Sequence, residues 1–172
     1  MIKKLFLSLA LVAVAATPAL AQNQVVIAEE DFEEDGDMIE APGFTLKNLE
    51  GKSVSLSDFK GKWVVLDFWG SWCKWCIKGI PEMKEAYNAY HSKGLEIIGI
   101  DCGDTPEVWK EAVANYQLPW VNVYNPDTSN LTKDYAIQGY PTKIIINPEG
   151  YLYEMVIGED PEFYEMLKQI FQ

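Results

Sequence analysis

From residue 41 onward, hydrophobic and polar positions follow two spacings, and each spacing predicts one kind of element. Hydrophobic residues alternate over 44–49 and 53–56, on either side of a Glu50-Gly51 turn, which predicts a β-hairpin. Four later runs of branched and aromatic residues predict buried strands over 63–69, 95–101, 120–125 and 142–147. A turn at 147–150 leads into a further strand over 151–158.

Hydrophobic residues three and four positions apart predict the helices. This spacing indicates a helix from about Lys74 to Ser92, with Gly94 as its stop signal. Two later helices, each opened by a capping residue and a proline, and one short helix are expected over 105–116, 160–171 and 129–137. Strands that alternate with helices imply a parallel core, and the terminal hairpin implies an antiparallel edge. The predicted class is therefore α/β with a mixed sheet.

The N-terminal segment has the three parts of a secretory signal peptide. Lys3 and Lys4 precede an apolar run over 5–16, and small residues end the segment at Ala21. The alternative is an uncleaved membrane anchor, but a bilayer requires about 20 apolar residues and Pro18 interrupts the continuation of the run. We expect cleavage after Ala21, export to the periplasm or beyond the cell, and no stable membrane insertion once the signal is removed.

Residues 22–40 are strongly acidic and contain little to bury, so they predict a flexible leader before one domain over 41–172. A calcium loop starting at Asp31 is excluded, because Pro42 occupies the twelfth position, where a bidentate glutamate is required. The predicted organisation is a signal peptide over 1–21, the leader and a single domain.

Composition narrows the classes of partner. The chain of 172 residues has 26 acidic and 14 basic residues, giving a formal net charge of −12, and every basic residue is a lysine. Such a chain lacks the positive surface that attracts nucleic acid or an anionic membrane. Its hydrophobic fraction of 48% is sufficient for a globular core.

Cys73 and Cys76 stand where a buried strand gives way to a helix. The first turn of a helix has unpaired backbone N–H groups that favour negative charge, so a thiol there has a pKa below its usual value of about 8.5. Cys73 is therefore the expected nucleophile. Cys76 follows three residues later on the same side of the turn, which makes it the expected resolving thiol of a redox disulfide.

Other uses of this cysteine pair have weaker support. A structural disulfide over so short a loop would gain little from chain entropy. A zinc site requires four ligands, and Cys102 and His91 would have to complete it. Haem attachment requires a histidine where Ile77 stands. We expect no metal and no cofactor, and keep the structural disulfide and the metal site as alternatives.

Separated segments of the chain resemble one family. The stretch "VVLDFWGSWCKWC" looks like the thioredoxin-fold active site. Residues 41–69, 102–126 and 139–150 are similar to the opening hairpin, the central insertion and the proline loop of the TlpA/ResA-like thiol-disulfide oxidoreductases of bacterial envelopes. The resemblance covers about 41–172. It implies a thioredoxin-like fold, with a mixed central sheet flanked by helices, an N-terminal hairpin and a central helix-strand insertion.

The resemblance also implies roles for further residues. Asp67 matches the buried acid of the thioredoxin family, whose pKa burial would raise, so that it could accept and return the Cys76 proton; a hydrogen-bonded structural aspartate is the alternative. Pro141 matches the family's cis-proline, which packs opposite the disulfide and lets the preceding backbone pair with an extended substrate. The expected substrate-binding residues are Trp72, Lys74, Trp75, Tyr140 and Pro141.

The chain departs from the family pattern at three positions. TlpA/ResA-like proteins often carry glutamate, asparagine and proline where this chain has Gly79, Asp67 and Trp75. The resemblance therefore implies that the strand supplies the acid, as in thioredoxin, within an envelope-type scaffold. Trp75 could present an apolar docking surface or simply pack. Pro81 matches the thioredoxin helix and predicts a kink.

Two residues remain. Cys102 is either a reactive third thiol or small buried packing, and the second is the more common use of a cysteine at a strand end. His91 lies at the C-terminal end of the first helix, where solvated interaction with the helix dipole is the ordinary interpretation.

These features predict an exported thiol-disulfide oxidoreductase that exchanges disulfides with a protein disulfide or dithiol, with an envelope electron donor or acceptor as second partner and the direction open. One alternative is a thiol peroxidase, because peroxiredoxins share the fold and the opening hairpin; their site uses an arginine, which this chain lacks. The other is a non-catalytic thioredoxin-fold module that binds a metal or a partner.

Overall fold

The computed structural model describes residues 38–172. The expected signal peptide over 1–21 and most of the expected leader over 22–40 lie outside the described residues. Within 38–172, no helix is both long and apolar enough to cross a membrane. The first described residues join the sheet, because Leu152 N–H donates to the Ile39 carbonyl at 2.8 Å and Glu40 forms a bridge with Tyr151.

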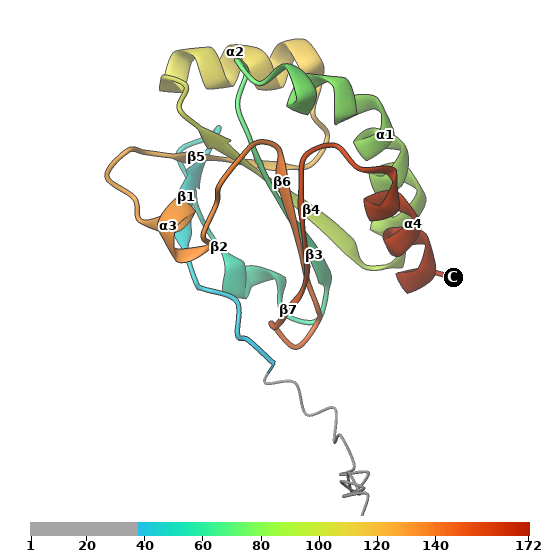
Figure 1. The fold of residues 1–172 in the computed structure, drawn as a ribbon. Coiled ribbons are helices and arrows are strands. Elements are labelled where there is room, and N and C mark those ends of the chain that lie inside the picture. Colours follow the sequence, from blue (N-terminus) through green and yellow to red (C-terminus); the bar gives the residue numbers. More distant parts are fainter. Residues whose placement is uncertain (1–37) are drawn as a thin grey trace, which may run out of the picture. The chain divides into compact units, whose positions relative to one another are not determined.

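In the described part of the chain, seven strands form one mixed sheet in the order β2-β1-β5-β4-β3-β6-β7 (Figure 1). The strands are β1 (Thr45–Asn48), β2 (Ser53–Ser55), β3 (Trp63–Trp69), β4 (Leu95–Cys102), β5 (Val121–Asn125), β6 (Thr142–Ile146) and β7 (Leu152–Ile157). Strands β3, β4 and β5 are parallel, whereas β1, β6 and β7 run antiparallel to their neighbours. The predicted mixed sheet and N-terminal hairpin are confirmed.

The helices also lie where the sequence predicts them. They are α1 (Lys74–Tyr90), α2 (Pro106–Tyr116), α3 (Leu131–Asp134) and α4 (Pro161–Ile170), with short 3-10 turns η1 (Leu56–Phe59) and η2 (His91–Lys93). Thr105 and Asp160 cap α2 and α4 with their side-chain oxygens, as expected. Helix α1 gives way to η2 slightly earlier than predicted, and Gly94 ends that turn at φ 105°.

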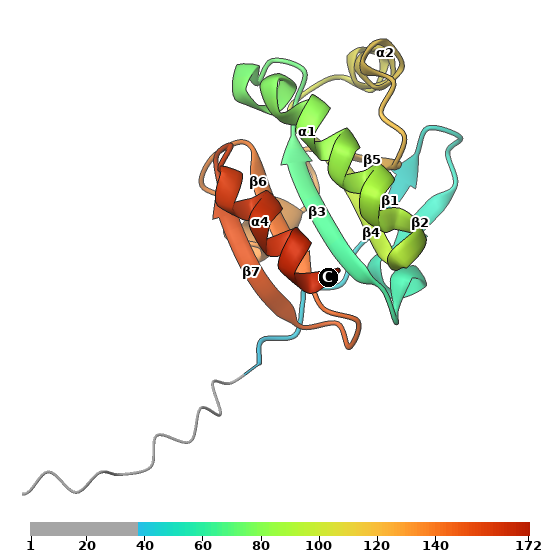
Figure 2. The same cartoon turned by 90° about the vertical axis from the view of Figure 1, so that its right-hand side faces the viewer.

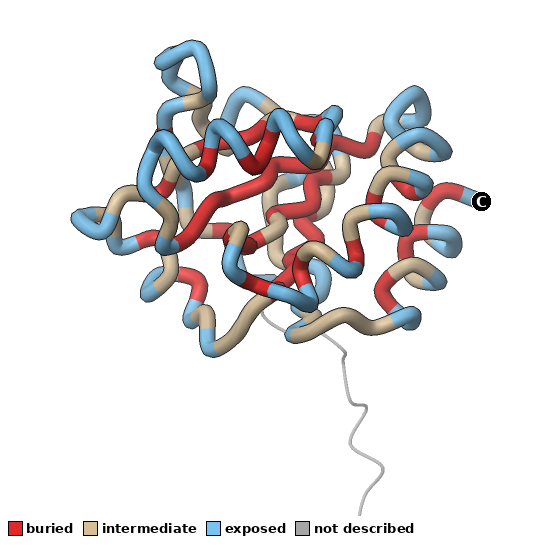
Figure 3. The backbone as a smooth tube through the Cα atoms, turned by 90° about the horizontal axis from the view of Figure 1, so that it is seen from above, coloured by how far each residue is buried: buried red, intermediate tan, exposed pale blue. Residues whose placement is uncertain are grey.

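The sheet separates two hydrophobic clusters. Alternation along β3 points Val65 and Trp69 to the face covered by α1, α2 and α4, and points Leu66 and Phe68 to the face covered by α3 and η1. Figure 2 shows α1 and α4 side by side on the first face, and in Figure 3 the buried backbone concentrates along the strands. The same alternation places Asp67 on the α1 face.

The loop from β3 to α1 lies at the carboxyl ends of the parallel strands, where α/β proteins commonly build sites. Its conformation is fixed by the neighbouring β4–α2 loop, because the Ser71 backbone N–H and hydroxyl both donate to the Asp104 carboxylate, at 2.7 and 2.8 Å. The start of α1 is thereby anchored next to the end of β4.

Candidate functional site

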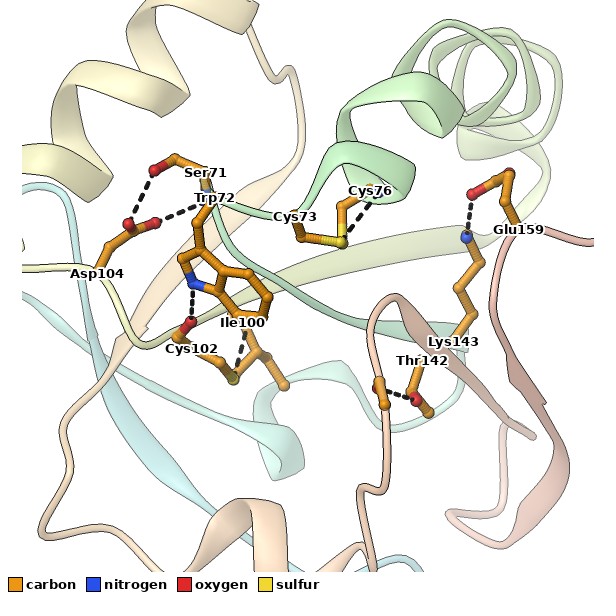
Figure 4. Close-up of a disulfide and its surroundings, with 11 residues drawn as sticks. Ser71, Trp72, Cys73, Cys76, Ile100, Cys102, Asp104, Thr142, Lys143 and Glu159 are labelled. Carbon is orange, nitrogen blue, oxygen red and sulfur yellow. Dashed lines mark hydrogen bonds and ion pairs between the residues drawn. A yellow bond between two sulfur atoms is a disulfide. The ribbon is translucent and has the colours of Figure 1, made fainter.

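Cys73 and Cys76 form a disulfide at the start of α1, with an S–S distance of 2.03 Å (Figure 4). Cys73 is the N-cap residue, and its Sγ accepts a hydrogen bond from the Cys76 backbone N–H at 3.1 Å. Both side chains are largely buried, with 5% and 7% of their surface exposed. In the reduced state, a thiolate at Cys73 would face the backbone N–H groups and the positive end of the dipole of α1.

Aromatic side chains flank the disulfide. The Trp72 indole N–H donates to the Cys102 carbonyl at 2.9 Å, and its ring lies edge-on to Tyr140 with centroids 5.2 Å apart. Trp75 lies on the outer side of the first turn, with Lys78 Nζ 4.9 Å from its ring centroid. Both tryptophans are more than half exposed, and Lys74 between Cys73 and Trp75 is exposed as well. Two exposed tryptophans thus flank a buried disulfide.

The proline loop lies beside the disulfide. The Tyr140–Pro141 peptide bond is cis, Pro141 is buried and Tyr140 is half-buried. The Thr142 hydroxyl donates to the Gly139 carbonyl at 2.7 Å, and Gly158 N–H donates to the Pro141 carbonyl at 2.7 Å. Pro141 and Cys76 line one small cavity.

Asp67 lines the same cavity, whose volume of about 10 Å³ is at the lower limit for holding one water molecule. Its Oδ1 is buried and has no hydrogen-bond partner among the described residues. Burial raises the pKa of Asp67 to about 6, with Lys143 lowering and Glu159 raising this pKa. Asp67 can therefore change its protonation state close to neutral pH.

Sequence reasoning missed two charged residues of this cavity, Lys143 and Glu159. Lys143 Nζ is 2.7 Å from Glu159 Oε2, and the two side chains are 3% and 11% exposed. A lysine inside the apolar run "TKIIIN" was a detectable signal, because a fully buried lysine requires a partner. Glu159 lies in the turn before α4 and has no comparable signal in the sequence.

The remaining candidates lie apart from this chemistry. Cys102 is buried, its thiol donates to the Ile100 carbonyl at 3.7 Å, and burial raises its pKa to about 12. His91 follows the C-terminal end of α1, opposite the end that carries the cysteines, and Nδ1 is 3.1 Å from the Leu95 carbonyl. Residues 38–172 contain no cluster of three or more side chains that could hold a metal ion. The four zinc ligands considered above are not brought together.

Comparison with known proteins gives consistent results. The model of the AhpC/TSA family matches residues 39–155. Thiol-disulfide oxidoreductase ResA from Bacillus cereus (strain ZK / E33L) is 41% identical over 120 residues, which are 70% of this chain and 69% of the relative. ResA from Bacillus subtilis (strain 168) is 34% identical over 148 residues, 86% of this chain and 80% of the relative.

A solved structure is similar to most of this chain. It is the thioredoxin domain of a thiol-disulfide oxidoreductase from Bacteroides vulgatus, with a TM-score of 0.72 and 35% sequence identity. The match covers 77% of this chain and 96% of that structure. The thioredoxin-like fold predicted from the sequence is confirmed.

Proposed function

Because the chain belongs to the AhpC/TSA family, and within it to the ResA-like thiol-disulfide oxidoreductases, we propose that it exchanges disulfides with a partner protein outside the cytosol through Cys73 and Cys76. The observation that carries this proposal is the joined cysteine pair at the N-terminus of α1, which shares a cavity with an unpartnered, half-buried aspartate. The roles below apply to the reduced protein acting on a substrate disulfide.

In the first step, the Cys73 thiolate attacks one sulfur of the substrate disulfide. A bond forms between Cys73 Sγ and that sulfur, and the other substrate sulfur leaves as a thiolate. The position of Cys73 at the N-cap supports this role, because the backbone N–H groups and the dipole of α1 favour the thiolate over the thiol.

In the second step, the Cys76 thiol gives its proton to the Asp67 carboxylate, and the new thiolate attacks Cys73 Sγ. The Cys73–Cys76 disulfide forms, and the second substrate sulfur leaves as a thiolate and takes up a proton. The substrate gains two electrons and the cysteine pair loses two. A pKa of about 6 suits Asp67 to this role, since a base works best when its pKa lies near the working pH. The same steps in reverse oxidise a substrate dithiol.

The surface beside the disulfide suits an extended polypeptide. Trp72 and Trp75 offer apolar area, and the Tyr140 backbone directly precedes Pro141, which lines the same cavity as Cys76. We assign substrate contact to this surface, together with Lys74 and Pro141.

Export rests on the N-terminal sequence, with its lysines, apolar run and small residues before Ala21. An oxidising compartment is where structural disulfides form and where dithiol exchange controls their state. In that compartment the protein would take part in redox homeostasis, with a separate envelope donor or acceptor returning its cysteine pair to the starting state. N-terminal sequencing of the protein isolated from the cell envelope tests cleavage after Ala21, and a chain that retains Lys3 and Lys4 would contradict cleavage. Absence of the protein from the envelope fraction would contradict export.

The activity is tested by reduction of insulin with dithiothreitol, followed by turbidity. The parent protein is expected to accelerate precipitation, whereas Cys73→Ser and Cys76→Ser are expected to lose this acceleration. Cys102→Ser is the matched control, because its thiol is buried away from the pair, and it should retain activity. Acceleration that survives both active-site substitutions would overturn the proposed roles.

The match to the AhpC/TSA family favours a second candidate, a thiol peroxidase. In that reaction Cys73 would attack a peroxide, release water or an alcohol, and form a sulfenic acid that Cys76 condenses to the disulfide. The chain contains no arginine to stabilise the thiolate and the peroxide, so dithiothreitol-dependent consumption of hydrogen peroxide should be no faster than with Cys73→Ser. Rapid consumption by the parent would favour the peroxidase.

A further inference from the structure

The space beside Cys76 on α1 is filled by a carboxylate from another element. Gly79 lies one turn after Cys76 and is buried. A Cβ atom added at Gly79 would overlap the carboxylate of Glu159, which comes from the turn between β7 and α4. The absence of a side chain at position 79 therefore admits Glu159 to the cavity that contains Asp67 and Cys76.

Glu159 is held there by two short contacts. Its Oε2 is 2.7 Å from Lys143 Nζ, and its Oε1 accepts a hydrogen bond from the Tyr164 hydroxyl at 2.6 Å. Figure 4 shows Lys143 and Glu159 beside the disulfide, across from Trp72. An ion pair this deeply buried contributes little net stability to the fold, because the cost of removing two charges from water offsets much of their attraction.

Lys143 does not pair with the carboxylate that lies opposite it in the sheet. Lys143 lies directly opposite Asp67 in the β3–β6 pairing, so the two side chains share a face with Cβ atoms about 5 Å apart. Even so, Lys143 Nζ pairs with Glu159, and Asp67 forms no ion pair with any described residue. Glu159 thus competes with Asp67 for the ammonium group of Lys143.

We propose that Glu159 is a positioning residue of the exchange reaction, which holds the Lys143 ammonium group away from Asp67 and so keeps Asp67 able to accept the Cys76 proton. The inference rests on the proposed function, because it requires that Asp67 receives this proton. Glu159 acts through Lys143 and Asp67. Its contacts with Lys143 on β6 and Tyr164 on α4 hold its carboxylate in place.

Several groups that can carry charge or titrate face Asp67. They come from α1, β6, the β7–α4 turn and α4, and they are Cys76, Lys143, Glu159 and Tyr164. Cys102 of β4 lies on the other face of the sheet. Burial raises the pKa of Cys102 and of Tyr164 far above neutral, so both stay neutral near pH 7. Burial raises the pKa of Asp67 most, and Lys143 and Glu159 are therefore the charges that adjust it further, in opposite directions.

The test measures the second step alone. The reduced protein is mixed with 5,5′-dithiobis(2-nitrobenzoic acid), and release of the coloured thiolate is followed by stopped-flow absorbance. Attack by Cys73 releases the first thiolate and attack by Cys76 releases the second, so the second phase reports loss of the Cys76 proton. Its rate is recorded from pH 4 to 9 to give the midpoint of the pH profile.

The two partners of the ion pair should shift this midpoint in opposite directions. In Glu159→Gln, Lys143 is free to pair with Asp67, and the midpoint should fall by about one pH unit with a slower plateau, since Asp67 becomes the weaker base. In Lys143→Met, the midpoint should rise. The control Glu165→Gln removes an exposed carboxylate of α4, 3.4 Å from Lys168, and should match the parent.

The double variant Lys143→Met/Glu159→Gln removes both members of the buried ion pair and serves if Glu159→Gln fails to fold. Its midpoint should lie below that of Lys143→Met. Circular dichroism establishes that each variant is folded. An unshifted midpoint in folded Glu159→Gln, or shifts of the same sign in both single variants, would overturn the role of Glu159. Loss of the second phase in the parent protein would instead overturn the proposed function.

Discussion

At the scale of single residues, the reactivity of the site depends on which titratable side chains are buried. Asp67 lies in a sheet between hydrophobic neighbours, and burial rather than a partner sets its pKa. Cys102, whose backbone carbonyl accepts the Trp72 hydrogen bond, has its pKa raised by burial as well, which leaves it a poor nucleophile. The same physical cause thus makes one side chain reactive and the other inert, because a carboxyl starts below neutral pH and a thiol starts above it.

Replacing Asp67 by asparagine should slow resolution of the mixed disulfide. Asparagine keeps the shape of the side chain but cannot accept the Cys76 proton, and general-base catalysis contributes on the order of 100-fold. The second phase of thiolate release at pH 7 should be slower by about this factor, while the first phase should be unchanged. An equal rate in both proteins would remove Asp67 from the relay.

At the scale of elements, α1 and the β7–α4 turn fit together only because position 79 is glycine. Glycine in a helix interior costs about 1 kcal/mol relative to alanine, so a glycine at Gly79 requires a compensating reason. That reason is the Glu159 carboxylate packed against the helix.

Gly79→Ala should therefore destabilise the protein although alanine is the better helix former. We expect a loss of about 1–2 kcal/mol in the free energy of unfolding, because overpacking a buried contact outweighs the gain in helix propensity. Denaturation in urea measures it. In a Lys143→Met/Glu159→Gly background, Gly79→Ala should instead raise the free energy of unfolding by up to about 1 kcal/mol. A gain in the parent background as well would show that the Glu159 side chain moves aside without cost.

The elements themselves were predictable from local patterns. Strand β3 and the caps Thr105 and Asp160 follow from periodicity and capping chemistry, which act between residues close in sequence. The Lys143–Glu159 pair was not predictable, since it depends on β6 lying next to β3 and on α4 lying next to α1. A Cys-x-x-Cys motif indicates its chemistry from adjacent residues, whereas the charged groups around it come from segments far apart in the chain.

At the scale of the whole molecule, the proton affinity of Asp67 is linked to folding. Its pKa is about 6 in the folded protein and about 3.9 in an unfolded chain, so the folded state binds the proton more tightly. This contribution to stability is fully present below about pH 4 and is lost as the pH rises through 6. Above that pH, the charged carboxylate of Asp67 is buried in the fold and lowers the free energy of unfolding.

Asp67→Asn should consequently raise the free energy of unfolding of the oxidised protein at pH 8, by on the order of 3 kcal/mol at most, with little effect at pH 4. Guanidinium denaturation at the two pH values measures the difference. The same gain at both pH values would mean that the charge of Asp67 is not its cause. A gain at pH 8 alone, together with the slower resolution expected at pH 7, would show that Asp67 serves the reaction at a cost in stability.

The entry of the chain into the sheet separates two ends of the domain. Ile39 pairs with Leu152, opposite Ile146 at the end of β6, whereas the proline loop with Pro141 precedes the start of that strand, about 13 Å away along it. The N-terminal entry and the disulfide therefore occupy opposite poles. A label, a bead or a fused protein attached ahead of residue 38 would leave the reactive pole open, so the domain can be immobilised by its N-terminus and still present its cysteines to large partners.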